Sequence, residues 1–351
     1  MIPLTQPTIA ENTREAVERV VKSNFFSPGA EVRLFEGEWA DYCGMKHGVA
    51  TNSGTTAIEV AAKALTIGNR DAVLIPAFTC IPVAVPFLHA GVDIYLADCG
   101  DDGNVTVESV SKAIEAHPHI GAVVLVHTYG NPVSQRVFDL CREKGKLILE
   151  DCCEAHGVMP QGDVAVFSFR GDKMITSGGT GGMVVTNDDN MAAYMREYVM
   201  LGLVKSQEYR YDAVCIGNGI QMSELQAAFG RCQIPMLDKL ISGRRRVASI
   251  YDNELRILKP SPRPYKSVVW RYMARYEGSR TTLIRKLRDE GVEAMASFRS
   301  LSQLLGGLTG KQYDYCPKAE EIGDRNVCLP VWGDMPEGTV DTVMRKVELV
   351  G

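Results

Sequence analysis

The sequence lacks the short motifs that mark several large classes of enzyme. No Gly-x-Gly-x-x-Gly follows an apolar stretch, and no Gly-x-x-x-x-Gly-Lys-Ser/Thr occurs, so neither a dinucleotide-binding turn nor a nucleotide-hydrolase phosphate loop is expected. The Gly-x-Ser-x-Gly elbow of serine hydrolases is also missing. The ten cysteines form no Cys-x-x-Cys pair, and the six histidines do not stand beside them at ligand spacing, which argues against a zinc site.

A large excess of either charge is missing too. Lys plus Arg is 38 and Asp plus Glu is 43, a net charge of −5, so neither a nucleic acid nor an anionic membrane is expected as the main partner. Residues 1–4 lack the basic start and apolar stretch of a signal peptide, and buried, reduced thiols suit a cytoplasmic protein. The charge-free run 72–92 contains three prolines, which predicts a strand, a loop and a short helix rather than a membrane span.

Helical and strand-like segments alternate over the first half of the chain. Helical spacing occurs at 12–23, 30–42, 55–65, 83–89, 107–116 and 134–144, and short apolar strands at 72–76, 92–97, 122–126, 147–150, 164–169 and 182–186. This alternation predicts an α/β fold with a mostly parallel sheet covered by helices on both faces. Such sheets bind ligands beyond the carboxyl ends of their strands.

The C-terminal part alternates strand and helix more loosely. A long helix is predicted over 223–252, and the three arginines at 244–246 are expected on its solvated face. With a length of 351 residues, two domains are expected: a large one over 1–245 and a smaller α/β domain over 246–351.

Ser53, Gly54 and Thr55 stand immediately before a predicted helix. Their backbone N–H groups and hydroxyls, together with the positive end of the helix dipole, could bind an anion such as a phosphate. An ordinary helix N-cap accounts for the same residues.

Asp151 and Lys173 are candidates for chemistry. Asp151 ends an apolar strand, where a carboxylate would face the ligand crevice, although a helix cap or structural ion pair is the alternative. Lys173 follows another strand end and a glycine-containing turn, and an amine held in a pocket there can form a Schiff base, whereas most lysines are solvated surface charges. A phosphate cradle, a carboxylate and a lysine are together what pyridoxal 5'-phosphate (PLP) requires.

The longest motifs resemble one family. Residues 150–157 (EDCCEAHG), 167–169 (FSF) and 173–178 (KMITSG) are similar to the DegT/DnrJ/EryC1/StrS family of PLP-dependent sugar aminotransferases, as are 126–130 (VHTYG) and 222–228 (MSELQAA). The resemblance covers nearly the whole chain. It implies the fold of type I PLP-dependent transferases and a homodimer with shared active sites.

The resemblance implies a role for individual residues. Lys173 would be the Schiff-base lysine and general acid/base, Asp151 would pair with the pyridine nitrogen, and Glu154 would lie near the ring hydroxyl. The remaining cofactor contacts would be Ser53, Gly54, Thr55, Ser168, Phe78 or Cys80, and Asn218. Candidate substrate contacts are Phe26, Ser27, His156 and Arg299.

Several positions depart from the family pattern. Cys80 stands where the family has an aromatic ring that stacks on the cofactor, with Phe78 two positions earlier. Gly219 stands where an asparagine usually reaches the partner's phosphate, and Asn218 is one position away. The chain between His156 and Asp163 is shorter than expected.

The sequence therefore predicts a cytoplasmic, homodimeric aminotransferase that moves an amino group from glutamate to a nucleotide-linked 4-keto-6-deoxy sugar, as in polysaccharide biosynthesis. Two alternatives stay open. One is transamination of a non-sugar or unusual keto acceptor, and the other is a catalytically weak PLP-binding regulatory protein.

Overall fold

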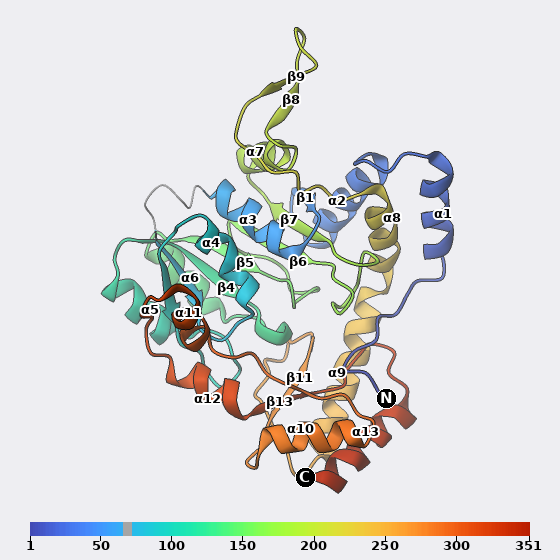
Figure 1. Cartoon of the computed structure of the whole chain (residues 1–351), viewed down its shortest axis with the longest axis vertical. Helices are drawn as coiled ribbons and strands as arrows, with labels where there is room; N and C mark the ends of the chain where they lie inside the picture. Colours follow the sequence, from blue (N-terminus) through green and yellow to red (C-terminus); the bar gives the residue numbers. More distant parts are fainter. Residues whose placement is uncertain (66–71) are drawn as a thin grey trace.

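A central twisted sheet organises the larger part of the molecule. The computed structural model describes residues 1–65 and 72–351, and within them seven strands form a sheet of order β1-β7-β6-β5-β4-β2-β3 (Figure 1). The strands are β1 (His47–Thr51), β2 (Ala72–Pro76), β3 (Ile94–Ala97), β4 (Ile120–Val126), β5 (Leu147–Asp151), β6 (Val164–Ser168) and β7 (Gly182–Thr186). Neighbours from β3 through β2, β4 and β5 to β6 pair in parallel, and β7 pairs antiparallel with β6 and β1. The predicted mostly parallel sheet is confirmed.

Apolar side chains cover both faces of this sheet. On β2, Val73 and Ile75 join one core cluster while Leu74 joins another on the opposite face, as the two-residue period of a strand requires. The helices of this part are α1 (Thr13–Ser23), α2 (Ala30–Tyr42), α3 (Gly54–Ala64), α4 (Val85–His89), α5 (Val107–Ala116), α6 (Gln135–Glu143), α7 (Asp189–Val199) and α8 (Glu224–Gln233). Of these, α1 packs against α8. Burial on both faces explains why these strands are continuously apolar.

A second, four-stranded antiparallel sheet is built from the C-terminal part. Its order is β10-β11-β13-β12, with β10 (Lys259–Pro260), β11 (Tyr272–Arg275), β12 (Met295–Ala296) and β13 (Asn326–Leu329). The helices of this part are α9 (Leu237–Glu254), α10 (Arg280–Asp289), α11 (Leu301–Thr309), α12 (Pro317–Arg325) and α13 (Glu337–Val350). The expected boundary at residue 245 falls inside α9, which runs from the large sheet towards the small one (Figure 1); the two-domain division stays a prediction.

Three features differ from the sequence-based expectation. The strand β1 was not anticipated. The helix predicted over 223–252 is two helices, α8 and α9, joined by a 3-10 turn at Ile234–Met236 that contains Pro235, which has no N–H to continue a helix. An unpredicted hairpin, β8 (Leu203–Lys205) and β9 (Tyr211–Ala213), projects from the molecule beyond α7 (Figure 1).

The expectation of a solvated arginine face is wrong for Arg244. Its side chain is buried, and Nη1 donates hydrogen bonds to the backbone carbonyls of Trp270 at 2.9 Å and Val331 at 3.0 Å. Burial lowers the pKa of Arg244 to about 9. This arginine therefore fastens α9 to the segments that precede β11 and follow β13.

The charge-free run 72–92 divides into β2, a 3-10 turn at Ile81–Val83 and α4, as predicted. Across the described ranges, no helix has the length and apolar character needed to cross a membrane.

Candidate active site

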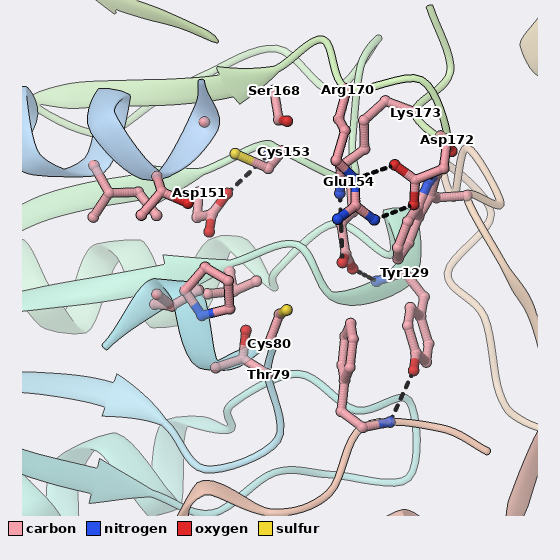
Figure 2. A pocket seen from close by; sticks show the side chains of 18 of the residues that line it. Thr79, Cys80, Tyr129, Asp151, Cys153, Glu154, Ser168, Arg170, Asp172 and Lys173 are labelled. Carbon is pink, nitrogen blue, oxygen red and sulfur yellow. Dashed lines mark hydrogen bonds and ion pairs between the residues drawn. The ribbon is translucent and has the colours of Figure 1, made fainter. Parts of the chain in front are cut away.

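A cavity of about 330 Å³ opens at the carboxyl ends of β2, β4, β5 and β6, where a parallel sheet is expected to bind its ligand. Its floor comes from the large sheet, and Trp270 and Phe298 close it from the C-terminal part. Figure 2 shows Asp151 and Ser168 near the start of α3, and Lys173 at the opposite end. The cavity thus has an anion-binding end and an amine end.

The anion-binding end is the N-terminus of α3. Ser53 caps this helix: its Oγ accepts from Thr56 N–H at 3.2 Å, and its carbonyl accepts from Ala57 N–H. The N–H groups of Gly54 and Thr55 precede the first intrahelical bond and so remain free to bind an anion. Ser168, at the end of β6, lies directly against Gly54 and also lines the cavity.

Gly54 has no room for a side chain. A Cβ there would lie 2.6 Å from Ser168 Cβ and 3.1 Å from Cys153 Sγ. Overpacking of this kind costs about 1–3 kcal/mol, so we expect Gly54→Ala to weaken PLP binding by about 5- to 150-fold. An absorbance titration with PLP measures this.

The matched control is Gly37→Ala on α2, where an added Cβ meets nothing within 4 Å. This change should leave PLP affinity at the wild-type value, because it adds only helix propensity. Equal affinity in the Gly54→Ala protein would show that the ligand does not approach this helix end.

Asp151 is the last residue of β5 and lies against the cavity. Its Oδ1 accepts a hydrogen bond from the backbone N–H of Cys153 at 2.8 Å, which fixes the orientation of the carboxylate. Within the described chain no hydrogen bond occupies Oδ2. A fixed carboxylate with one free oxygen can hold a protonated ring nitrogen.

Lys173 occupies the other end of the cavity, on the turn that follows β6. Its side chain is buried, with Nζ 3.9 Å from Glu154 Oε1 and 4.1 Å from the centre of the Trp270 ring. The Trp270 indole N–H donates to the backbone carbonyl of Asp172 at 2.9 Å and so holds the lysine turn in place.

Glu154 is buried between Lys173 and Tyr129. Its Oε2 accepts the backbone N–H of Tyr129 at 2.9 Å. Burial raises the pKa of Glu154 to about 7, and the positive charge of Lys173 opposes the rise. Tyr129, with a left-handed φ of 56°, also accepts the backbone N–H of Phe298 at its hydroxyl, which joins the two parts of the molecule.

The raised pKa of Glu154 makes the stability of the apoprotein depend on pH. Between its ordinary value of 4.5 and about 7, the folded state holds a proton that the unfolded state has released, so stability falls as pH rises through this window. We expect the difference in unfolding free energy between wild type and Glu154→Gln to fall by up to about 3 kcal/mol from pH 5 to pH 8. Urea denaturation at several pH values measures it.

Glu143→Gln, an exposed change at the end of α6, is the control and should give a flat difference. If the difference in unfolding free energy between wild type and Glu154→Gln does not change with pH, Glu154 stays ionised throughout. If that difference rises with pH, the pKa of Glu154 is lowered in the folded state and not raised.

Cys80 and Phe78 are separated by the structure. Cys80 lines the cavity, whereas Phe78 is buried below it against Tyr129 and Phe298, with ring centres 6.0 Å apart in each case. Phe78 is therefore wrong as a ring contact of the expected cofactor. Burial raises the pKa of the Cys80 thiol to about 11, which keeps it protonated.

Other predicted residues lie outside this cavity. Phe26, Ser27, Asn218 and Arg299 are exposed; Asn218 donates to Glu59 on α3 at 3.0 Å. His156 is wrong as a substrate contact, because its ring is fully buried among aromatic rings, including those of Trp39 and Phe167. Burial lowers its pKa to about 3, so it is neutral.

The structure adds residues that motif reasoning did not assign. Arg170 and Asp172 flank Lys173 in sequence and line the cavity, so their position beside the lysine was the available signal. Trp270 and Arg271 also line it but come from the segment before β11, and nothing local in the sequence connects them to Lys173.

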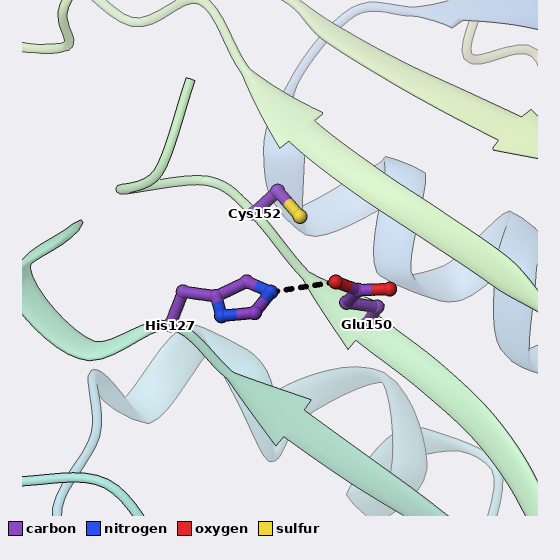
Figure 3. A group of neighbouring side chains, drawn as sticks. All are labelled: His127, Glu150 and Cys152. Carbon is purple, nitrogen blue, oxygen red and sulfur yellow. Dashed lines mark hydrogen bonds and ion pairs between the residues drawn. The ribbon is translucent and has the colours of Figure 1, made fainter. Parts of the chain in front are cut away.

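His127, Glu150 and Cys152 form a second cluster (Figure 3). Glu150 and Asp151 are consecutive residues of β5, so their side chains point to opposite faces of the sheet. His127 Nε2 lies 2.7 Å from Glu150 Oε1, and its Nδ1 accepts the backbone N–H of Val133 at 2.9 Å. Glu150 Oε2 accepts two further backbone N–H groups, at 2.6 and 2.7 Å. Because both ring nitrogens and both carboxylate oxygens already have partners, this cluster is a structural hydrogen-bond network rather than a metal centre.

The residues of the main cavity fit PLP. Two free helix N–H groups suit its phosphate, Asp151 suits its ring nitrogen, and Lys173 suits its aldehyde. Fold and site together define a PLP-dependent transferase of the α/β type.

The comparisons with known proteins specify the family. The DegT/DnrJ/EryC1/StrS aminotransferase family matches residues 7–348, and the chain belongs to it. The protein is therefore a PLP-dependent aminotransferase.

Two relatives and one solved structure illustrate the similarity. The chain is 31% identical to the GDP-perosamine synthase of Caulobacter vibrioides over 368 residues, covering 99% of this chain and 98% of that protein. It is 35% identical to the GDP-perosamine synthase of Vibrio cholerae over 265 residues, covering 73% and 71%. The aminotransferase TlmJ from Streptoalloteichus hindustanus has a TM-score of 0.91 at 25% identity, covering 99% of this chain and 98% of that one.

Proposed function

We propose that this protein transfers an amino group from glutamate to the keto group of a nucleotide-linked 4-keto-6-deoxy sugar. The observation that carries the proposal is the convergence of Lys173, Asp151 and the α3 N-terminus in one cavity. The curated relatives at 31% and 35% identity, both named GDP-perosamine synthase, support a nucleotide-sugar acceptor.

Bound PLP supplies an aldehyde that carries the amino group and a ring that accepts electrons. The residues of this chain do the rest. The N–H groups of Gly54 and Thr55 bind the phosphate, and Asp151 keeps the ring nitrogen protonated. Lys173 Nζ would take the proton from the donor's α-carbon and give it to the cofactor carbon that receives the amino group. It would move a proton in the opposite direction when the acceptor is aminated, so its own protonation state is restored in each half-reaction.

We also propose a cytoplasmic homodimer with shared active sites. The cavity, at about 330 Å³, is at the lower end of the range of about 300–1,000 Å³ for ligand sites. A nucleotide sugar bound together with PLP therefore extends beyond it. The exposed predicted substrate contacts Phe26 and Ser27 are available to the extended acceptor in a second subunit, and the exposed Asn218 to the cofactor phosphate of that subunit.

The experiment is a donor and acceptor assay with purified protein. PLP should produce a visible absorbance band that glutamate bleaches. Release of 2-oxoglutarate is then followed with GDP-, dTDP- and UDP-linked keto sugars, and light scattering gives the oligomeric state. If glutamate bleaches the PLP band but the protein turns over none of these keto sugars, the sugar acceptor is overturned and a different keto substrate is favoured.

A further inference from the structure

Arg271 is a buried cation with too few partners. Its side chain is only 6% exposed, and its Nη2 donates to Asp172 Oδ2 at 3.1 Å. That oxygen already accepts from Arg170 at 2.7 Å, as the other Asp172 oxygen does. Arg271 Nη1 is buried and has no hydrogen-bond partner among the residues that the structure describes. A guanidinium offers five N–H donors, so most of this group's capacity is unused.

The other buried arginine of this region, Arg244, donates to two carbonyls and to the hydroxyl of Thr5. Its Nε is also buried without a partner among the described residues, but Arg244 is not among the residues that line the cavity. A buried donor without a partner is costly and calls for an explanation such as a ligand. Arg271, by contrast, is one of the residues that line the active-site cavity.

The charges around Arg271 call for an anion. Arg170 and Arg271 share the single carboxylate of Asp172. Burial alone would raise the pKa of Asp172, but hydrogen bonds from Arg170 and the charges of Lys173, Arg170 and Arg271 lower it to about 2, so this carboxylate is ionised. Lys173 adds a further positive charge nearby, and Glu154 is only partly ionised near neutral pH. This end of the cavity therefore carries more positive than negative charge.

We propose that Arg271 binds the α-carboxylate of the amino donor. Its guanidinium carbon lies 4.3 Å from the centre of the Trp270 ring, and Lys173 Nζ lies 4.1 Å from the same centre. The α-carboxylate is bonded to the carbon whose proton Lys173 removes, so it must come close to this lysine. The planar guanidinium matches a carboxylate with paired hydrogen bonds. This inference rests on the proposed amino-acid donor.

The test compares donors in the first half-reaction, measured as bleaching of the PLP band. Arg271→Gln should lower the apparent affinity for glutamate and for alanine alike, by about 10- to 100-fold. It should not change the apparent affinity for 4-aminobutyrate, which has no α-carboxylate. Arg271→Lys keeps the positive charge but loses the paired N–H groups of the guanidinium, so its donor affinities should lie between those of wild type and Arg271→Gln. Arg275→Gln on β11, whose side chain pairs with Glu277 and Glu321, is the matched control and should match wild type.

Each alternative outcome is distinct. If Arg271→Gln lowers the apparent affinity for glutamate but not for alanine, Arg271 binds the donor's side-chain carboxylate and the proposal is overturned. The proposal is also overturned if the variant keeps its affinity for both donors but binds the acceptor more weakly, because Arg271 would then bind an anionic group of the acceptor. Should Arg271→Gln fail to fold, wild type alone decides, because equal affinity for glutamate and 4-aminobutyrate would overturn the proposal. If no α-amino acid bleaches the PLP band of the wild-type protein, the proposed amino-acid donor is overturned as well.

Discussion

Replacing Lys173 with alanine is expected to lower the rate of amino transfer by about 10⁴-fold, the upper end of the range for loss of a positioned acid/base group. Lys173 is buried in the cavity beside Glu154 and Trp270, and in the proposed reaction it is the amine that moves the proton in both half-reactions. The variant should still bind PLP through the α3 N-terminus and Asp151, but without the wild-type absorbance band. Single-turnover bleaching by glutamate measures the rate.

Two further variants sharpen this prediction. Lys173→Arg should be equally inactive, because a guanidinium does not give up its proton. Lys144→Ala, an exposed change at the end of α6, should match wild type. Small amines added to the Lys173→Ala protein should restore part of the rate, since they can carry the proton in the emptied space. A variant that keeps most of the wild-type rate without added amine would contradict the assignment.

Asp151→Asn is expected to lower the transfer rate by about 10²- to 10³-fold, the scale on which a single electrostatic contact to a developing charge acts. The asparagine keeps the shape and can still accept the Cys153 N–H, so the fold should not change. It lacks the negative charge that, in the proposed reaction, keeps the ring nitrogen protonated, so the ring should accept electrons less well. Steady-state rates with saturating PLP separate this effect from weaker cofactor binding.

Asp139→Asn, on the exposed side of α6, is the control and should have the wild-type rate. A pH profile adds an independent readout: the Asp151→Asn protein should regain rate as pH falls, because a more acidic solution protonates the ring nitrogen. An Asp151→Asn protein with the wild-type rate and pH profile would exclude pairing of Asp151 with the ring nitrogen.

The sequence alone determined the fold class, and it indicated the residues of the proposed reactive centre. The parallel strands were recognisable because burial on both faces makes each of them continuously apolar. Gly54, Asp151 and Lys173 were recognisable because each stands at a strand end or helix start within a local motif. The predicted ligand end of the sheet is where they meet. All three depend on short-range patterns, which a single sequence displays.

The tertiary structure alone decided which more distant residues join this centre. Arg271 reaches Asp172 across 99 residues of sequence. Arg244, one of three consecutive arginines, is buried because its helix happens to face two backbone carbonyls from other segments. The sequence left open whether Phe78 or Cys80 faces the cavity; in the structure Phe78 is buried in the core and Cys80 lines the cavity. These outcomes depend on long-range packing, and packing partners that are far apart in sequence leave no local pattern.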